Sequence, residues 1–394
     1  MPPIIVARAR RDTPAASKVL HFNNAGAALP PQHVTDTVVN HLRLESEIGA
    51  YEAAHHAEQR CNAVYSSVAS LLNAQRSEIA LTQGADTAWA AAFNAIAFRP
   101  GDRILTSMVE YNSSYLGFMH MRDRVGIEVT PVPDDNTGQL DVDALRAMLD
   151  ERVKLIAVAH VPSNGGLVNP VEAIGAVARR NEILYLVDAC QSIGQLPVDV
   201  EAIGCDFLSF TGRKFLRGPR GTGGLYVRSG VLDQLTPWTV DGRSAVWTSH
   251  DTYEYAPGAL RFESFEHSVA TRLGLGAAAD YAQLWGLDAI ETRIVKAADN
   301  LREQLSEMGG VTVHDKGARK CGIVTFSIAG LEAEQVKSAL SAERVNVWTT
   351  GRASTLLDME ARRLDSIVRA SLHYYNSDDE IDRFCGLVAR LTQR

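Results

Sequence analysis

Apolar side chains recur at helical spacing through residues 31–75, which is the first clear pattern along the chain. Two series carry this pattern: Val34, Val38, His41 and Leu42, followed by Val64, Val68, Leu71 and Leu72. An apolar residue at every third or fourth position allows one face of a helix to pack on a core while the other face meets water. We therefore predict that residues 31–75 are helical.

From Glu78 the pattern changes to short, nearly continuous apolar runs that alternate with helical stretches. Continuous apolar runs are typical of parallel strands buried on both faces, and their alternation with helices indicates an α/β fold. We therefore predict a mostly parallel sheet of seven strands. The predicted strands are 79–82, 103–107, 128–132, 155–160, 184–188, 207–210 and 224–227, and the predicted helices between them include 85–97, 142–149 and 170–180.

After about residue 284 the pattern changes again, to a long charged helix followed by shorter elements of both kinds. The predicted helices are 288–308, 334–341 and 378–392, and the predicted strands are 311–314, 321–328, 345–349 and 367–372. We predict three parts of the chain: an N-terminal segment over 1–30, a large domain over 31–284, and a small α+β domain over 285–394.

Composition and charge narrow the class of protein. The net charge of −8 argues against nucleic acid or an anionic membrane as the main partner. No apolar run reaches the roughly 18 residues that a membrane helix needs. The five cysteines are scattered and contain no C-x-x-C pair, so we expect reduced thiols in a cytoplasmic protein. We identify no metal-binding motif.

One carboxylate and one lysine follow neighbouring predicted strands. Asp188 ends the first strand, Lys214 comes shortly after the second, and a glycine-rich stretch over 218–226 follows. Alone, Asp188 is as well explained as a helix cap and Lys214 as a solvated charge. Together they favour pyridoxal 5′-phosphate, because a lysine amine binds its aldehyde carbon and a carboxylate keeps its ring nitrogen protonated. We predict this cofactor in the large domain.

A short segment between a predicted strand and a helix, Gly84-Ala85-Asp86-Thr87, is a candidate phosphate site. Small residues at the start of a helix let backbone N–H groups face a phosphate. An ordinary helix cap by Asp86 or Thr87 explains the same segment.

Three further residues lie close in sequence to Asp188 and Lys214. Thr211 and Arg213 could supply a hydroxyl and a cation to the same phosphate, and Gln191 could reach the phenolic oxygen of the cofactor.

Arg369 and Asn164 are candidates for binding a substrate carboxylate. An arginine in a buried strand needs a partner, and a carboxylate held by both of its amino groups is one. A structural ion pair at Arg369 is an equally good interpretation, and Asn164 lies in a turn-like loop.

These motifs, in this order, resemble the class V aminotransferase family of fold-type I pyridoxal-phosphate enzymes, which includes the cysteine desulfurases. The resemblance runs from His21-Phe22-Asn23-Asn24-Ala25-Gly26 to Glu380-Ile381-Asp382. It implies that Lys214 binds the cofactor, that Asp188 contacts the ring nitrogen, and that Gln191 contacts the phenolic oxygen. It also implies a substrate site formed by Asn164, Arg369, Ala25, Gly26 and Tyr51, and a homodimer with shared active sites, to which residues 31–75 could extend.

The departures from the family pattern bear on the reaction. Desulfurases carry a cysteine in the region that corresponds to residues 349–355, where this chain has none. Asn112 stands where the family stacks a histidine on the cofactor ring, and Tyr111 is the nearest aromatic residue. Arg213 replaces the histidine before the lysine. A threonine that usually follows Arg-Phe-Glu and reaches the partner's phosphate is absent, because the chain reads Ser264-Phe265-Glu266-His267 after Glu263.

These variants resemble the branch that holds hercynylcysteine sulfoxide lyases, which act in ergothioneine biosynthesis, and isopenicillin N epimerases. We predict a C–S lyase that acts on a cysteine S-conjugate or sulfoxide, such as hercynylcysteine sulfoxide. Every candidate reaction requires Lys214 to remove a proton as a neutral amine, so we expect burial and Arg213 to lower its pKa.

Three alternatives remain. An epimerase needs a second acid, for which Tyr111, Tyr51, His55 and His56 are candidates, whereas an aminotransferase returns the proton to the C4′ carbon of the cofactor. A non-enzymatic regulator would need a basic DNA-binding segment that this chain lacks. If a persulfide thiol exists, Cys321 is the best candidate, because it follows a glycine-containing turn.

Overall fold

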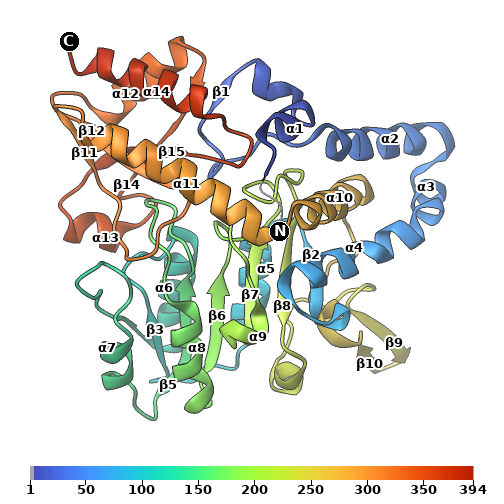
Figure 1. The fold of residues 1–394 in the computed structure, drawn as a ribbon. Coiled ribbons are helices and arrows are strands. Elements are labelled where there is room, and N and C mark those ends of the chain that lie inside the picture. Colours follow the sequence, from blue (N-terminus) through green and yellow to red (C-terminus); the bar gives the residue numbers. More distant parts are fainter. Residues whose placement is uncertain (1–3, 394) are drawn as a thin grey trace.

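A computed structural model describes residues 4–393 (Figure 1). Its central element is a sheet of seven strands in the order β2-β8-β7-β6-β5-β3-β4, in which only β8 runs against its neighbours. The prediction of a mostly parallel seven-stranded sheet is therefore confirmed. The strands are β2 (Ile79–Thr82), β3 (Arg103–Thr106), β4 (Glu128–Pro131), β5 (Val153–Ala159), β6 (Leu184–Asp188), β7 (Phe207–Thr211) and β8 (Gly223–Val227).

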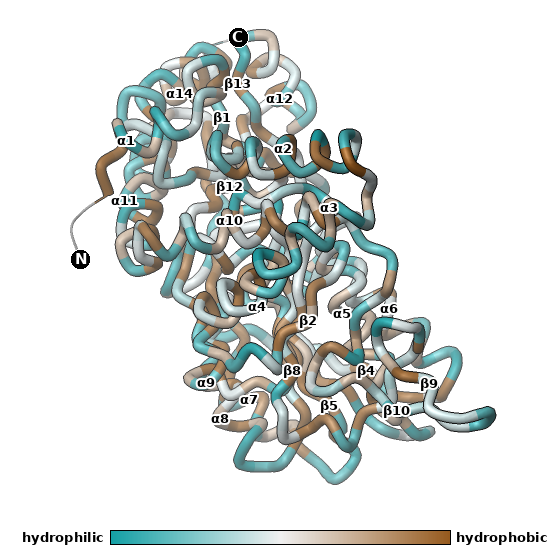
Figure 2. The backbone as a smooth tube through the Cα atoms, turned by 90° about the vertical axis from the view of Figure 1, so that its right-hand side faces the viewer, coloured by the Kyte–Doolittle hydropathy of each residue, from teal (hydrophilic) through white to brown (hydrophobic). Residues whose placement is uncertain are grey.

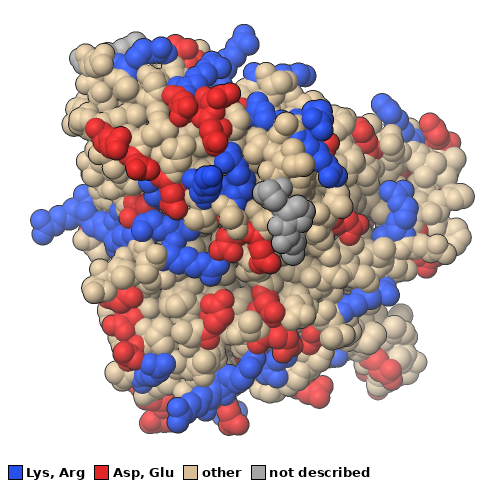
Figure 3. Space-filling view, in the orientation of Figure 1, with Lys and Arg blue, Asp and Glu red and all other residues tan. Residues whose placement is uncertain are grey.

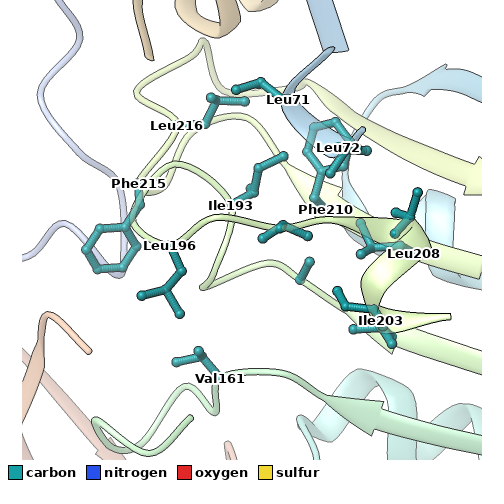
Figure 4. Close-up of a cluster of buried hydrophobic side chains, with 14 of the residues drawn as sticks. Leu71, Leu72, Val161, Ile193, Leu196, Ile203, Leu208, Phe210, Phe215 and Leu216 are labelled. Atoms are coloured by element: carbon teal, nitrogen blue, oxygen red, sulfur yellow. The ribbon is translucent and has the colours of Figure 1, made fainter. Parts of the chain in front are cut away.

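Alternate residues of β6 enter different cores, which explains why its sequence is apolar throughout. Tyr185 and Val187 belong to one cluster of buried side chains, and Leu184 and Leu186 belong to another on the opposite face. Part of the first cluster lies around the ends of β6 and β7 (Figure 4). The helices that follow the strands are α5 (Ala85–Asn94), α6 (Asn112–Val125), α7 (Val142–Ala147), α8 (Val171–Arg180) and α9 (Val200–Ile203).

The predicted helical region over 31–75 is confirmed as three helices with breaks between them. They are α2 (Gln32–Ile48), α3 (Ala50–His56) and α4 (Glu58–Leu72). The break after α2 falls at Gly49, whose φ of +99° favours glycine. Both α2 and α4 pack on α10 (Val269–Trp285), a helix that the sequence pattern did not reveal. Ten residues of α10 are buried on several sides, so it shows no polar face.

The C-terminal part holds a four-stranded antiparallel sheet in the order β11-β12-β15-β14. Its elements are α11 (Leu287–Ser306), β11 (Val311–Val313), β12 (Ile323–Ile328), α12 (Ala333–Ala342), β13 (Val345–Asn346), β14 (Trp348–Gly351), α13 (Leu356–Ala361), β15 (Ser366–Ser371) and α14 (Asp378–Leu391). The predicted strand over 345–349 is therefore two strands. Its first part, β13, pairs with β1 (Leu20–His21), and Leu20 lies in the C-terminal core. The domain boundaries at residues 30 and 284 stay a prediction.

The remaining elements of the described chain are one short helix, one hairpin and four short 3₁₀ helices. They are α1 (Val6–Arg11), the hairpin β9 (Ala245–Ser249) and β10 (Thr252–Tyr255), and short 3₁₀ helices at Pro14–Ser17, Arg76–Glu78, Ser229–Gln234 and Gly258–Phe262. The hairpin projects from the body of the molecule (Figure 2). Acidic and basic side chains are interspersed on the face that Figure 3 shows. Within residues 4–393, no helix combines the length and the apolar character that crossing a membrane requires.

Candidate active site

Asp188 and Lys214 meet because β6 and β7 are neighbouring parallel strands. Asp188, the last residue of β6, lies opposite Ser209 of β7, and Lys214 follows the end of β7 by three residues. Both side chains line one cavity of about 540 Å³ at the carboxyl edge of the sheet, where α/β proteins bind ligands. The cavity also receives most of the other predicted cofactor residues, which are Gly84, Ala85, Asp86, Gln191, Thr211 and Arg213.

The amine of Lys214 lies in surroundings that disfavour its charged form. Burial lowers its pKa, with further contributions from Arg213 and Arg369, although Cys190 and Asp188 act in the opposite direction. This direction agrees with the expectation for an amine that accepts a proton.

The start of α5 offers free backbone donors to the cavity. Gly84 precedes the helix, and no side chain in the described part of the chain caps its first turn. The neighbouring strand β8 passes close beneath this turn. A Cβ atom at Gly223 would lie 2.7 Å from the carbonyl carbon of Gly84 and 2.5 Å from the carbonyl oxygen of Phe210. Glycine at 223 therefore allows the turn to lie where a phosphate could be bound.

Two predicted cofactor residues do not line the cavity. Thr87 donates its hydroxyl to the carbonyl of Gly84 at 2.8 Å and faces a separate hollow. Asn112 starts α6, and its backbone nitrogen donates to the carbonyl of Ser354 at 2.9 Å. Tyr111 lines the cavity instead, because it precedes the helix and so projects from the loop. The aromatic neighbour of the cavity on this loop is therefore Tyr111.

Three other predicted cofactor residues carry hydrogen bonds of their own. The hydroxyl of Thr211 donates to the carbonyl of Thr222 at 3.3 Å, and Arg213 donates to the carbonyl of Gly26. The amide nitrogen of Gln191 donates to the carbonyl of Ala25 at 3.2 Å. Its oxygen is buried and meets no partner among residues 4–393. The second amide hydrogen of Gln191 can donate a hydrogen bond to the phenolic oxygen of the cofactor.

A second cavity of about 380 Å³ adjoins the first and shares Lys214, Gln191 and Tyr111 with it. Arg369 of β15 lines this cavity, as do Ala25 and Gly26. The sequence analysis did not identify several of its other residues, which include Trp348, Thr350, Ser354 and Arg220. Arg220 lies within the glycine-rich stretch and could have been found there, whereas Trp348 has no signal near the other motifs.

Arg369 has no acidic partner. Its side chain is 6% exposed and donates to the carbonyl of Ser163 at 2.7 Å. Within the described residues no carboxylate lies within 4 Å of it, and its Nε has no hydrogen-bond acceptor. Burial lowers its pKa to about 10, so the guanidinium is still charged at neutral pH. A structural ion pair within residues 4–393 therefore does not account for this arginine, and its role toward a substrate carboxylate stays a prediction.

Asn164 and Tyr51 lie outside both cavities. The amide of Asn164 donates to Asp358 of α13 at 2.7 Å, and Asp358 also pairs with Lys316 and Arg362, both at 3.1 Å. Tyr51 lies on α3 with 80% of its side chain exposed. Neither residue lines a cavity of the single chain, and their substrate role stays a prediction.

The structure also changes the order of the cysteine candidates. Cys321 is fully buried and lines neither cavity, and burial raises its pKa to about 12. Cys190 lines the first cavity, and its backbone nitrogen donates to Asp188 at 2.8 Å. Its position two residues after Asp188 was the sequence signal for this placement. Two residues of the 349–355 segment, Thr350 and Ser354, line the second cavity.

Pyridoxal phosphate fits these residues. The cavity combines a lysine of lowered pKa, a carboxylate at a strand end and the uncapped start of a helix. The buried hydroxyl of Ser209 and the amide oxygen of Gln191 meet no hydrogen-bond partner in the described chain, and both residues line the cavity. No group of three or more metal-binding side chains occurs within residues 4–393.

Comparison with known proteins places these residues in a family. The sequence model of "Aminotransferase class-V" matches residues 20–384. The chain is 30% identical to a "Probable cysteine desulfurase" of Methanothermobacter thermautotrophicus, over 94% of both chains. It is 31% identical to a protein of the same name from Xylella fastidiosa, over 96% of this chain and 93% of the relative.

Among solved structures, the apo structure of a cysteine desulfurase from Thermococcus onnurineus superposes with a TM-score of 0.92 and 27% identity, covering 100% of this chain and 99% of that one. A complex of the cystine C–S lyase C-DES with cysteine persulfide has a TM-score of 0.87 and 24% identity, covering 96% of this chain and 99% of that one, which shows a common fold. The predicted fold and cofactor are confirmed. The chain belongs to the class V aminotransferase family, whose cofactor is pyridoxal 5′-phosphate.

Proposed function

We propose that this protein is a C–S lyase that removes a sulfur leaving group from Cβ of a cysteine-derived amino acid. The observation that carries the proposal is the composition of the second cavity. It combines an arginine that meets no carboxylate with residues of the 349–355 segment, and no cysteine of residues 4–393 lines it, whereas Cys190 lines the adjoining cavity. A reaction on a cysteine derivative that needs no persulfide acceptor suits this arrangement.

Arg369, Lys214 and Asp188 each have a separate role in the proposed reaction. Arg369 holds the substrate carboxylate and so orients the Cα–H bond, and the Nζ atom of Lys214 accepts the α-proton as a neutral amine. Asp188 holds the proton on the ring nitrogen, and the bound cofactor supplies the electron sink. The Cβ–S bond then breaks, and its electron pair leaves with sulfur. With water, the products are pyruvate, ammonia and either a thiol or, from a sulfoxide, a sulfenic acid.

The substrate we propose is an S-conjugate of cysteine or its sulfoxide. Hercynylcysteine sulfoxide is one member of this class and stays a prediction.

Epimerisation is the second candidate, and Tyr111 is the observation that favours it. Its side chain lines both cavities together with Lys214, and burial raises its pKa, which keeps the hydroxyl protonated. A protonated group across the cavity from the base is what epimerisation requires.

Product analysis separates these functions. The holoenzyme would be given cysteine, an S-alkylcysteine, its sulfoxide and hercynylcysteine sulfoxide, and pyruvate, alanine and optical rotation would be followed together. We expect pyruvate from a conjugate or sulfoxide without loss of optical purity in the remaining substrate. Racemisation without pyruvate would establish the epimerase instead, and alanine with protein-bound sulfur would establish a desulfurase.

We also propose that the protein is a cytoplasmic homodimer. The five cysteines are free thiols, as expected in a reducing compartment. Apolar side chains are exposed on α3 and on the β9–β10 hairpin, which lie on the same side of the molecule in Figure 1. Tyr51 is 80% exposed and Trp247 is 78% exposed. A second chain covering this side would bury them.

A further inference from the structure

Arg217 is a buried arginine without an acidic partner, three residues after Lys214. Its side chain is 1% exposed and ranks among the largest fully enclosed side chains of the protein. Within the described chain no carboxylate lies within 4 Å of its guanidinium, and its hydrogen bonds go to neutral oxygens. Because enclosing an unpaired charge is unfavourable, the residue needs another explanation.

The guanidinium is held by three hydrogen bonds and a set of aromatic rings. Nε donates to the carbonyl of Leu29 at 2.9 Å, Nη1 donates to the hydroxyl of Tyr374 at 2.7 Å, and Nη2 donates to the hydroxyl of Thr13. Three tyrosine rings surround its central carbon, at centroid distances of 4.7 Å for Tyr375, 5.2 Å for Tyr374 and 5.7 Å for Tyr281. Ring faces and oriented oxygens stabilise the charge in place of a carboxylate.

These contacts join parts of the chain that lie far apart in sequence. The backbone nitrogen of Arg217 donates to the carbonyl of Lys214 at 2.9 Å, which closes a turn around the lysine. Its side chain donates a hydrogen bond to the hydroxyl of Tyr374. Tyr374 lies just beyond the end of β15, the strand that carries Arg369. A second bond joins the same two segments, from His373 Nε2 to the carbonyl of Phe215 at 2.8 Å. The turn of Lys214 and the strand of Arg369 are therefore connected through the side chains of Arg217 and His373.

We propose that Arg217 is a positioning residue that fixes the separation between the Lys214 amine and the Arg369 guanidinium. An amino acid carries its amine and its carboxylate on one carbon, so the site must bind both groups at the same time. A small displacement of either Lys214 or Arg369 therefore weakens substrate binding. The inference rests on the roles given to Lys214 and Arg369 in the proposed function. It does not depend on which bond breaks afterwards.

Two small amines test this role without turnover. 2-Aminoisobutyrate and tert-butylamine both lack an α-hydrogen, and tert-butylamine carries a methyl group in place of the carboxylate. The dissociation constant of each would be measured from the change in visible absorption of the holoenzyme. The ratio of the two constants is the carboxylate preference, which reports how well both ends of the site are aligned.

We expect the unmodified holoenzyme to prefer the carboxylate by about tenfold or more, since a hydrogen bond to a charged group contributes on that order. Tyr374→Phe keeps the ring and removes one acceptor from Arg217, and Arg217→Met removes the charge. Both should lose most of the preference while the affinity for tert-butylamine changes less than about twofold. Tyr374→Phe decides the question even if Arg217→Met does not fold.

Tyr185→Phe is the matched control, because it removes another buried hydroxyl, one that donates to the carbonyl of Val171 at 3.1 Å. It should keep the full carboxylate preference even where its melting temperature falls as far as that of Tyr374→Phe. A full preference in Tyr374→Phe, or in Arg217→Met where that variant folds, would overturn the role of Arg217 and leave the proposed function intact. A wild-type enzyme without any preference would overturn the role of Arg369 and, with it, that of Arg217.

Discussion

At the scale of single residues, burial lowers the pKa of two basic side chains of the site. Lys214 and Arg369 face the same cavity, and burial lowers the pKa of both. Arg369 starts from a much higher value, so at a pKa of about 10 it remains a cation at neutral pH. Lys214 starts lower and is shifted toward the neutral amine. Both directions suit the roles proposed for Arg369 as carboxylate anchor and Lys214 as proton acceptor.

Asp188→Asn should keep the cofactor and lose turnover. An amide cannot hold a proton on the ring nitrogen, so the electron sink weakens while the contacts to the phosphate remain. Borohydride reduction followed by peptide mass analysis should still find the cofactor on Lys214, and steady-state kinetics should show a fall in kcat of about a hundredfold or more. Near-normal turnover would remove Asp188 from this role.

Arg369→Lys should raise KM strongly and also lower kcat, with the visible spectrum of the holoenzyme unchanged. A lysine cannot reproduce the forked contact, and losing a hydrogen bond to a charged group costs about 1.5–3 kcal/mol, or roughly 10- to 150-fold in affinity. The measurement is steady-state kinetics beside a thermal melt. A lower melting temperature with unchanged kinetics would mean that the arginine is only structural.

Glu110 should make the protein less stable as the pH rises. It is 5% exposed and accepts hydrogen bonds from Ser107 and Ala159, and burial raises its pKa from 4.5 to about 8. Between these values the unfolded chain loses the proton and the folded chain keeps it. The folded state then binds more protons, and stability falls with rising pH, by up to about 1.4 kcal/mol per unit.

Denaturant unfolding of wild type and Glu110→Gln from pH 5 to 8 measures this effect. The glutamine oxygen can accept the same two hydrogen bonds but does not titrate. The variant should therefore show the flatter pH dependence, and parallel curves for the two proteins would exclude the buried acid as the cause.

At the scale of elements, the site depends on how closely β8 approaches the start of α5. Gly223→Ala should displace the Gly84 turn, because the new Cβ would meet backbone atoms on two sides at less than 3 Å. We expect a stability loss of about 1–3 kcal/mol and weaker cofactor binding. Equilibrium dialysis of the cofactor and a thermal melt test this. Gly221→Ala is a nearby control. Its new Cβ would have no atom within 4 Å, so the only cost is the backbone strain of a positive φ. Equal cofactor affinity in the Gly223 variant and wild type would contradict the crowding argument.

At the scale of the whole molecule, the exposed apolar side of α3 and the β9–β10 hairpin predicts a dimer. Light scattering should give twice the chain mass of 42.8 kDa. Trp247→Glu, on the hairpin, should shift the protein toward monomer and lower its activity, because burying a charge at an interface is unfavourable. Leu284→Glu, at a site 65% exposed near the end of α10, is the control and should stay dimeric. A fully active wild-type monomer at micromolar concentration would rule out a shared site.

The sequence by itself determined the fold class, the cofactor and the pair Asp188 and Lys214. All of these follow from local rules: buried parallel strands are apolar throughout, and ligands gather at their carboxyl ends. Elements without such a signal were missed, such as α10, whose burial on several sides hides the helical period.

Only the tertiary structure decided which nearby side chains face the cavity. Tyr111 lines the cavity and Asn112 does not, because α6 begins at Asn112. The amide of Asn164 donates to Asp358 because α13 packs beside it. Cys190 rather than Cys321 reached the cavity, and Arg217 became a link between distant segments. In each case the direction of a side chain is set by contacts with residues remote in sequence, which a local pattern does not contain.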